Sequence, residues 1–162
     1  MNAPEQVVAE IEERLRPLAR DANLAWWDAN LDATDAHERR RVATQLALSD
    51  LLADPTLFGR IEEARPLASG EVRRQLDLLH DDVLMRQVPE ALRHRIVELE
   101  AAVEGRFAKH RGIVGGVELD DNELKRVLRV SDDVAERREA WEASKTIGAV
   151  VADDVRELAR LR

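Results

Sequence analysis

The chain has 162 residues, of which 44% are hydrophobic and 36% charged, and a formal net charge of −8 at pH 7. This acidic balance disfavours binding to nucleic acid, which needs a basic surface to displace counterions, and the absence of cysteine excludes disulfides and thiolate-bound zinc. The sequence has no apolar run of membrane-spanning length and no signal peptide at its start, so we expect a cytoplasmic protein without membrane or nucleic-acid partners.

The first two predicted elements are helices. With only three Trp and two Phe, the core must consist mainly of Leu, Val, Ile and Ala, which favours helices over a β-sandwich. Apolar residues recur every three or four positions over 4–30, which predicts an amphipathic helix bent at Pro17. Asp35 and Glu38 have the spacing of a capping box, so a second helix is expected over 35–53.

Three more helices are expected before residue 110. The first is a short helix with Asp54 as its N-cap and Pro55 as its first residue. It is expected to end before Pro66. Ser69 is expected to cap the next, in which apolar residues step by four, three and four up to Val83. The fifth helix is expected to begin at Pro89, with an apolar pattern made of Leu92, Ile96, Leu99, Val103 and Phe107.

The helical pattern breaks at residues 110–119, where Gly115 and Gly116 separate two short β-branched pieces and predict a small hairpin. A helix is expected from Asp120 or Asp121 to about Leu128. Ser131 then caps a long helix that Gly148 loosens or interrupts, and the last apolar residues are Val151, Val155, Leu158 and Leu161.

Taken together, these patterns predict an all-α fold of six or seven amphipathic helices in an elongated bundle. One small hairpin interrupts it near residues 110–119. The sequence has no internal repeat of fixed period, no low-complexity segment and no linker, so a single helical unit over 1–162 is expected.

Two pairs of a carboxylate and a histidine have the spacing of metal ligands on a helix. Asp77 precedes His80 by three residues, and Glu90 precedes His94 by four, so each pair lies on one helix face. Ferritin-like di-iron proteins use a Glu-x-x-His unit twice with two further core glutamates, whereas this chain has one such unit with a shorter Asp. Solvated helix residues are the better interpretation, and we predict no metal site.

Other catalytic patterns are also weak. The serines lack a nucleophile elbow, and glycines 112–116 lack the spacings that bring backbone amides to phosphates. Adjacent carboxylates typically serve helix starts and solubility, and here they are Asp81 with Asp82, Asp120 with Asp121, and Asp132 with Asp133. We therefore predict no catalytic or cofactor-binding residue in this chain.

Arginines cluster at 39–41, at 73–74, and at Arg93 with Arg95. They alternate with acidic residues, which predicts solvated helix faces. Trp26 and Trp27 lie about 100° apart on a helix, so if Trp26 joins the core, Trp27 lies at its edge. Packing at the rim and contact with another protein or a ligand both remain open for Trp27.

The second half of the chain combines several motifs of one enzyme family. Leu119 to Leu124 leads to Ser131, a charged helix, the triplet Ala140-Trp141-Glu142 and a last helix from Val150 to Arg162. The sequence DANLAWWDANLDAT at residues 21–34 is similar to the aromatic end of that family's first helix. With these motifs the chain resembles the angiotensin-converting-enzyme-like zinc peptidases, the peptidyl-dipeptidase A family, particularly their bacterial members.

This resemblance implies the amino-terminal lid and cleft-wall segment of a larger, mostly helical dipeptidyl carboxypeptidase. The family's zinc is held by an H-E-x-x-H helix and a downstream Glu, and this chain contains neither. The resemblance thus implies a chain that is not catalytic alone. Its partner would be the remainder of the peptidase or another helical surface, and peptide substrate and zinc would bind only in the full-length enzyme.

The chain departs from the family at two places. Residues 110–119 stand where animal members have a disulfide-closed loop, and Ser144 with Lys145 stands where the family has a chloride-binding Trp-Arg pair. The alternative to a peptidase segment is a self-contained helical interaction protein. A segment should expose an apolar patch larger than a few hundred Å² around Trp27, Trp141 and the final helix, whereas a complete domain should cover these residues.

Overall fold

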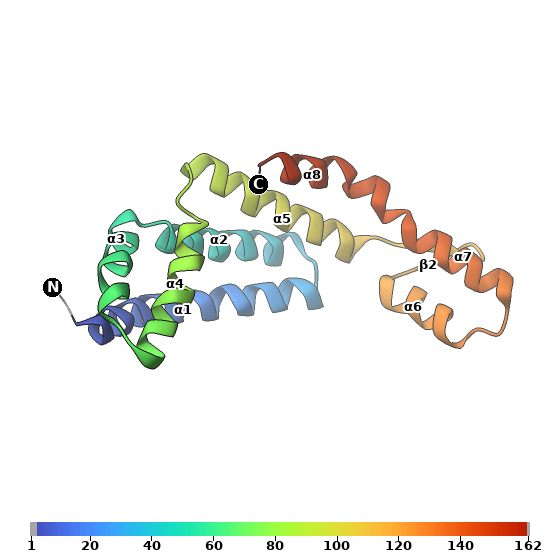
Figure 1. Cartoon of the computed structure of the whole chain (residues 1–162). Coiled ribbons are helices and arrows are strands. Elements are labelled where there is room, and N and C mark those ends of the chain that lie inside the picture. The colour runs from blue at the N-terminus through green and yellow to red at the C-terminus, as the bar shows by residue number, and fades with distance from the viewer. Residues whose placement is uncertain (1–2, 162) are drawn as a thin grey trace.

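The computed structural model of the chain describes residues 3–161. The described residues exclude Met1 and Asn2, at the start of the predicted unit, and Arg162, at the end of its last family-like motif. Figure 1 shows an elongated arrangement of helices with one hairpin at the end farthest from the amino terminus. The elements are α1 (Pro4–Leu31), α2 (Asp35–Leu52), α3 (Pro55–Ala64), a 3-10 turn η1 (Arg65–Leu67), α4 (Gly70–Leu84), α5 (Glu90–Lys109), β1 (Gly112–Val114), β2 (Val117–Leu119), α6 (Asp121–Val130), α7 (Val134–Lys145) and α8 (Ile147–Leu161).

The predicted all-α fold with one small hairpin is confirmed. In the described part of the chain α7 and α8 are separated by Thr146 alone, so they form the long interrupted helix that the sequence predicts. Counted as one, they bring the number of helices to seven. The interruption falls two residues before Gly148, where the Thr146 hydroxyl donates to the carbonyl of Ala143 over 2.7 Å.

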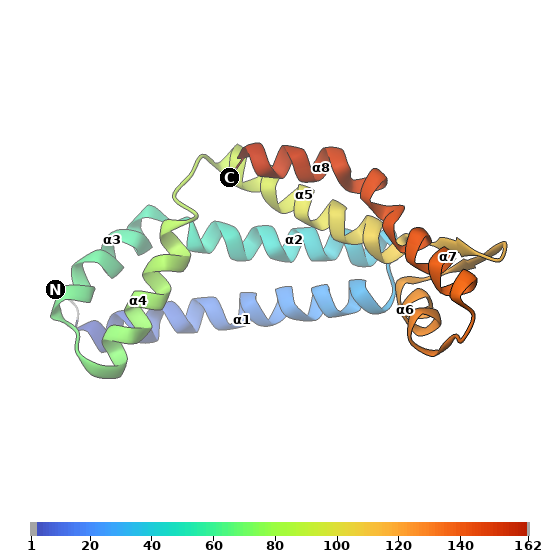
Figure 2. The ribbon, with the colours of Figure 1, turned by 45° about the vertical axis from the view of Figure 1, so that its right-hand side comes forward.

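The larger hydrophobic core lies where α3 and α4 cross one end of the α1–α2 pair (Figure 2). Ile61, Leu76 and Val83 are fully covered there. Towards the other end, the residues that α1 buries are Ala22, Ala25 and Ala29. Small side chains at these positions allow α2 to run close along α1, which joins the two helices over much of their length. The core consists of Val7, Val8, Ile11, Leu51, Leu52, Leu57, Ile61, Ala64, Leu76 and Val83.

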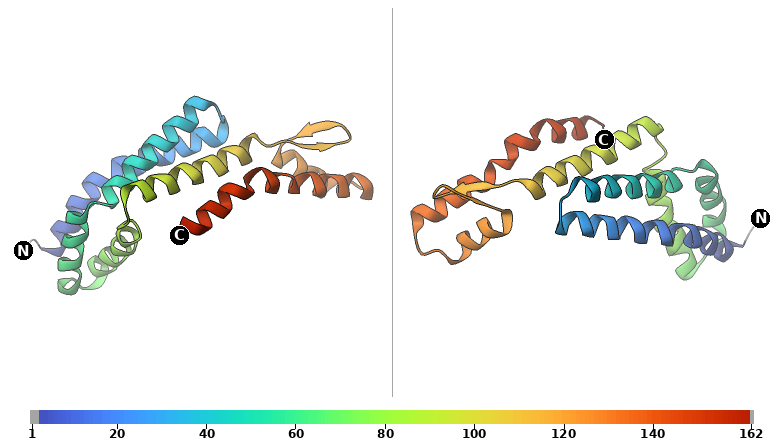
Figure 3. Two further views of the ribbon diagram at one scale, coloured as in Figure 1. Left: turned by 90° about the horizontal axis from the view of Figure 1, so that it is seen from above. Right: turned by 180° about the vertical axis from the view of Figure 1, so that it is seen from behind.

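A second, smaller core forms at the hairpin end from Val114, Leu124, Ala140 and Ala143. Gly112 is required here, because a Cβ at this position would lie 2.9 Å from Leu124 Cδ1 and 3.0 Å from Ala143 Cβ. From this end α8 returns along α5, as the two views in Figure 3 show. The helix α8 buries none of its side chains fully.

The hairpin confirms the glycine pattern. Val114 pairs with Val117 across the turn, and Gly115 and Gly116 have φ angles of +58° and +79°. A two-residue turn with both φ angles positive matches the twist of antiparallel strands and favours glycine at both positions. The following helix starts with a capping box in which Asp120 accepts from the Glu123 backbone and Glu123 accepts from the Asp120 backbone, each over 2.8 Å.

Two predicted helix caps are wrong. Thr34, and not Asp35, is the N-cap of α2 and accepts from the His37 backbone over 3.3 Å. Glu38 is drawn away from the predicted capping box because its carboxylate lies 3.1 Å from the Arg41 guanidinium. At the start of α7 the cap is Asp133, which accepts from the Ala135 backbone over 2.8 Å.

Ser131 lies two residues too early to cap α7. Its hydroxyl instead donates to Glu136 and accepts from the Asp133 backbone. Ser69 has the predicted N-cap position of α4, but its side chain makes no capping hydrogen bond. The predicted cap of α3 is confirmed, since Asp54 accepts from the Thr56 backbone over 2.9 Å. No helix in residues 3–161 is both long and apolar enough to cross a membrane.

Replacing Leu76 with Ala should destabilise the protein by about 2–5 kcal/mol, because the side chain is fully buried and its removal leaves a cavity in the larger core. Leu78 on the same helix is 62% exposed and supplies the matched control. Urea unfolding followed by circular dichroism measures both variants. Equal losses for Leu76→Ala and Leu78→Ala would contradict the placement of this core.

Candidate functional site

Asp77 and His80, the first pair with metal-ligand spacing, each contact other side chains. Asp77 accepts from Arg73 Nε over 2.9 Å and from Arg65 Nε over 3.0 Å. His80 Nε2 lies 2.8 Å from Glu62 of α3, and its ring centroid lies 5.7 Å from that of Phe58. The interpretation as solvated helix residues is wrong for His80, whose side chain is only 14% exposed. These side chains tie α4 to α3 and to η1.

Glu90 and His94, the second pair with metal-ligand spacing, also have different surroundings. His94 Nε2 lies 2.9 Å from Asp50 Oδ1, and Arg93 donates to the same oxygen over 2.6 Å. Glu90, the other member of the pair, is exposed at the start of α5. Burial alone would raise the pKa of the Asp50 carboxyl, but the hydrogen bonds from Arg93 and His94 outweigh it and hold the pKa below its ordinary value. This cluster ties α5 to the end of α2.

Neither histidine has the surroundings of a zinc ligand. Each faces a carboxylate from another helix, and within residues 3–161 no three His, Cys, Asp or Glu side chains converge in a way that could hold a metal ion. His37 contacts the Asp32 carbonyl over 2.8 Å, and His110 contacts the Thr146 hydroxyl over 2.8 Å. The described residues therefore do not fit the zinc of the peptidase family.

The serines and adjacent carboxylates, which the sequence offers as weak catalytic candidates, have local contacts. Ser144 donates to the Trp141 carbonyl over 2.7 Å, and Ser49 is buried in α2. Asp120 and Asp133 are helix caps, as adjacent acidic residues at helix starts usually are. Asp82 lies 3.6 Å from Arg86 one turn later.

A buried arginine is the polar feature that sequence reasoning missed. Arg41 is 5% exposed and donates to Glu104 of α5 over 2.8 Å. Its guanidinium also donates to the Ala101 carbonyl and lies 3.1 Å from Glu38. Trp26 of α1 donates to the same Glu104 carboxylate over 3.2 Å. The network, which we call the Arg41 junction (Trp26, Glu38, Arg41, Ala101 and Glu104), joins α1, α2 and α5.

The junction also corrects two expectations. The arginines at 39–41 do not all lie on a solvated face, because Arg41 points to α5 while Arg40 pairs with Asp28 of α1 over 2.7 Å. Trp26 is 47% exposed and does not join the core stripe of α1, which passes through Ala22, Ala25 and Ala29. Its indole nitrogen is instead used at the surface as a hydrogen-bond donor.

A groove of about 530 Å³ runs between α2 and α5 beside this junction. Its floor is apolar and consists largely of small side chains, and charged residues stand at its ends. The lining residues are Glu38, Arg39, Val42, Ala43, Leu46, Glu98, Ala101, Ala102, Gly105, Arg106 and Lys109. Gly105 is required where the helices meet, since a Cβ there would lie 2.8 Å from Glu38 Oε1.

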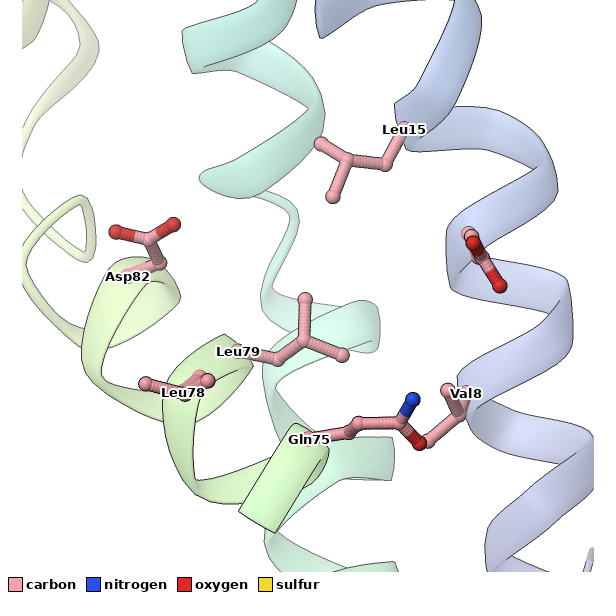
Figure 4. A pocket seen from close by; sticks show the side chains of 7 residues that line it. Val8, Leu15, Gln75, Leu78, Leu79 and Asp82 are labelled. Carbon is pink, nitrogen blue, oxygen red and sulfur yellow. The ribbon is translucent and has the colours of Figure 1, made fainter. Parts of the chain in front are cut away.

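A smaller hollow of about 240 Å³ lies between α1 and α4. Figure 4 shows Val8 and Leu15 on one side facing Leu79 on the other, with Gln75, Leu78 and Asp82 along α4. Glu12 completes the lining, and it is already paired with Arg16. The hollow is an apolar gap between two helices, with polar atoms only at its edge.

Large apolar side chains remain exposed along the outer surface. Trp27 is 58% exposed and Trp141 is 55% exposed, and Lys145 lies over the Trp141 ring at 5.4 Å. On α8, Val150 and Val155 are 49% and 47% exposed. On α5, Phe107 is 47% exposed and shares a helix face with Val103 and Ile96. A patch of exposed apolar side chains typically marks a contact with another protein surface.

No protein-family model matches the sequence, and no curated protein matches it. The candidate site is therefore defined by the described side chains themselves. It consists of the exposed apolar side chains Trp141 on α7, Val150 and Val155 on α8, and Trp27 on α1, which have the chemistry of protein-contact residues.

Replacing Arg41 with Ala should destabilise the protein by about 3 kcal/mol, because the mutation leaves the buried Glu38 carboxylate without its cation and breaks the link between α2 and α5. Arg40→Ala removes a neighbouring pair that is about half exposed, so less than about 1 kcal/mol should be lost. Chemical denaturation of both variants tests the contrast. An Arg41→Ala variant as stable as the wild type would show that the junction contributes nothing to stability.

Stability should fall as the pH drops below the ordinary pKa of aspartate. Hydrogen bonds from Arg73 and Arg65 lower the pKa of Asp77, and those from Arg93 and His94 lower that of Asp50, so both folded-state values lie below the unfolded ones. Groups of this kind stabilise the fold above the unfolded pKa and lose that contribution as pH falls through the folded pKa. The double variant Asp50→Asn, Asp77→Asn should show a flatter acid limb in unfolding measured against pH. An unchanged slope would contradict the assignment.

Proposed function

We propose that this chain is the lid and cleft-wall segment of an angiotensin-converting-enzyme-like zinc dipeptidyl carboxypeptidase, and that it is not catalytic alone. The proposal rests first on the sequence resemblance, in which Ser131, the Ala140-Trp141-Glu142 triplet and the aromatic end of the first helix stand in the family's order. On this proposal the substrate is a peptide that binds in the full-length enzyme, in the cytoplasm.

The observation that carries the proposal is the exposure of large apolar side chains on α7 and α8. Trp141 is 55% exposed, and α8 has no fully buried side chain, although valine, alanine and leucine make up much of its sequence. A helix of this composition ordinarily buries an apolar stripe. The stripe of α8 made of Ile147, Val151, Leu158 and Leu161 is only half-buried, and the remainder of the peptidase would cover the side chains that stay exposed. Trp27 on α1 would lie against the same partner or line the cleft, so the exposure of both tryptophans supports a segment over a complete domain.

The chemistry of the described side chains is consistent with a scaffold role. Histidines and carboxylates are used to tie one helix to another, as in the contacts of His80 with Glu62 and of His94 with Asp50. Such contacts fix the helices relative to one another, as the wall of a cleft requires. The family's zinc ligands would come from the H-E-x-x-H segment that this chain lacks.

A self-contained helical interaction protein is the second candidate. The observation that favours it is the groove between α2 and α5, which is lined by apolar and small side chains and could receive a partner without any further part of a peptidase. The exposed face of α7 and α8 weighs against it, since a complete domain should cover such a face.

The decisive experiment is to sequence the reading frame beyond Arg162 and to express the extended product beside the 162-residue chain. The extended frame should encode H-E-x-x-H, and its product should retain stoichiometric zinc after dialysis against a weak chelator and release dipeptides from peptide carboxyl ends. The 162-residue chain should do neither. A stop codon directly after Arg162, or stoichiometric zinc on the short chain, would contradict the proposal.

A further inference from the structure

The groove between α2 and α5 has a feature that the proposed function does not use, which is a different charge at each end. The two helices run antiparallel, since Arg41 contacts Ala101 and Glu104, whereas Asp50 contacts Arg93 and His94. The beginning of α2 therefore lies beside the end of α5. One end of the groove carries Arg39 and Lys109, and the other end carries Glu98.

Some of the charged side chains at the two ends already have ion-pair partners, and others do not. Lys109 pairs with Asp35 over 3.3 Å, and Arg106 pairs with Asp154 of α8. Within residues 3–161, Arg39 has no hydrogen-bond or ion-pair partner, and neither has Glu98. The charge of Glu98 acts on Arg95 one turn earlier, but that guanidinium already donates to Glu157 over 2.7 Å. Arg39 and Glu98 are thus the available charges, one at each end.

The floor between them suits close helix packing. Ala43, Ala101, Ala102 and Gly105 have little or no side chain, so another backbone can approach, and Val42 supplies apolar contact. The carboxylate oxygen Glu38 Oε1 at the floor is buried and has no hydrogen-bond partner. It lies against Gly105, and the same carboxylate is held by Arg41, so the floor is closed where the two helices meet.

An apolar floor with one positive and one negative end is complementary to itself under two-fold symmetry. If two grooves meet face to face about an axis that lies in the interface and is perpendicular to the line joining Arg39 and Glu98, Arg39 of each copy lies opposite Glu98 of the other. Both ion pairs then form at once, and the small floors face each other. A two-fold pair of α2–α5 hairpins is a four-helix packing, which is a common way to bury such surfaces.

We propose that the groove between α2 and α5 is a homodimer interface between two copies of this chain. In this dimer, Arg39 of each copy forms an ion pair with Glu98 of the other. The interface does not include Trp141 or the exposed valines of α8. It is therefore independent of the proposed peptidase function. Because the floor spans only a few helical turns, the dimer dissociates in the micromolar range.

Sedimentation equilibrium of the full chain, from low to several hundred micromolar concentration, tests the proposal. The wild-type chain should pass from monomer to dimer. Arg39→Glu and Glu98→Arg should each weaken the dimer by about tenfold or more, because each places like charges opposite one another. The double variant Arg39→Glu, Glu98→Arg restores both pairs with reversed sign and should dimerise within about threefold of wild type.

Two controls separate this interface from effects of net charge and folding. Arg20→Glu and Glu13→Arg make the same charge changes on exposed residues of α1 outside the groove and should leave the dimer unchanged. Ala43→Arg fills the floor and should give a monomer, whereas Ala135→Arg on the exposed face of α7 should not. Circular dichroism verifies the helical content of every variant.

A wild-type chain that stays monomeric over the whole range would overturn the proposal. So would a dimer that both single reversals leave intact, or a double variant no better than the singles, since either result places the contact elsewhere.

Discussion

The arrangement of the helices depends on one buried cation. Arg41 lies where α1, α2 and α5 meet, and its guanidinium reaches the Glu38 and Glu104 carboxylates and the Ala101 carbonyl. Burying an arginine is costly unless most of its donors are satisfied, so the junction holds only if α5 stays in this position against α2. The hairpin end and α8 continue from α5 or pack against it, and their placement therefore depends on the same contact.

The two halves of the molecule are held together by different forces. The α1–α4 half buries Ile61, Leu76 and Val83 completely, so apolar burial stabilises it. In contrast, the stripe of α8 made of Ile147, Val151, Leu158 and Leu161 is only half-buried, and ion pairs join α8 to α5, from Arg95 to Glu157 and from Arg106 to Asp154. Partly exposed pairs of this kind contribute little to stability. The ordered helix α8 thus keeps Val150 and Val155 exposed, where another protein surface can contact them.

Local features of this fold were predictable from the sequence, and features that depend on packing were not. The hairpin follows from Gly115 and Gly116, and the start of α3 follows from Asp54, because these conformations are decided within a few residues. The burial of Arg41 depends on where α5 lies, and a run of three arginines gives no sign of which one faces it. The spacing of apolar residues allows Trp26 to join the core stripe, but the stripe passes through the alanines at 22, 25 and 29, where α2 lies too close for a ring. The exposure of Trp27 could be anticipated from its position beside the core stripe, whereas that of Trp141 could be anticipated only through the family resemblance.

The central claim is that α8 is held only by a half-buried stripe and by ion pairs, and native-state hydrogen exchange tests it most directly. In the 162-residue chain, amides of α8 should exchange through local opening at a much lower free energy than those of α1 around Ala25, which should require global unfolding. Protection of α8 equal to that of α1 would contradict the claim, because it would show that α8 belongs to the same cooperative core and needs no further surface.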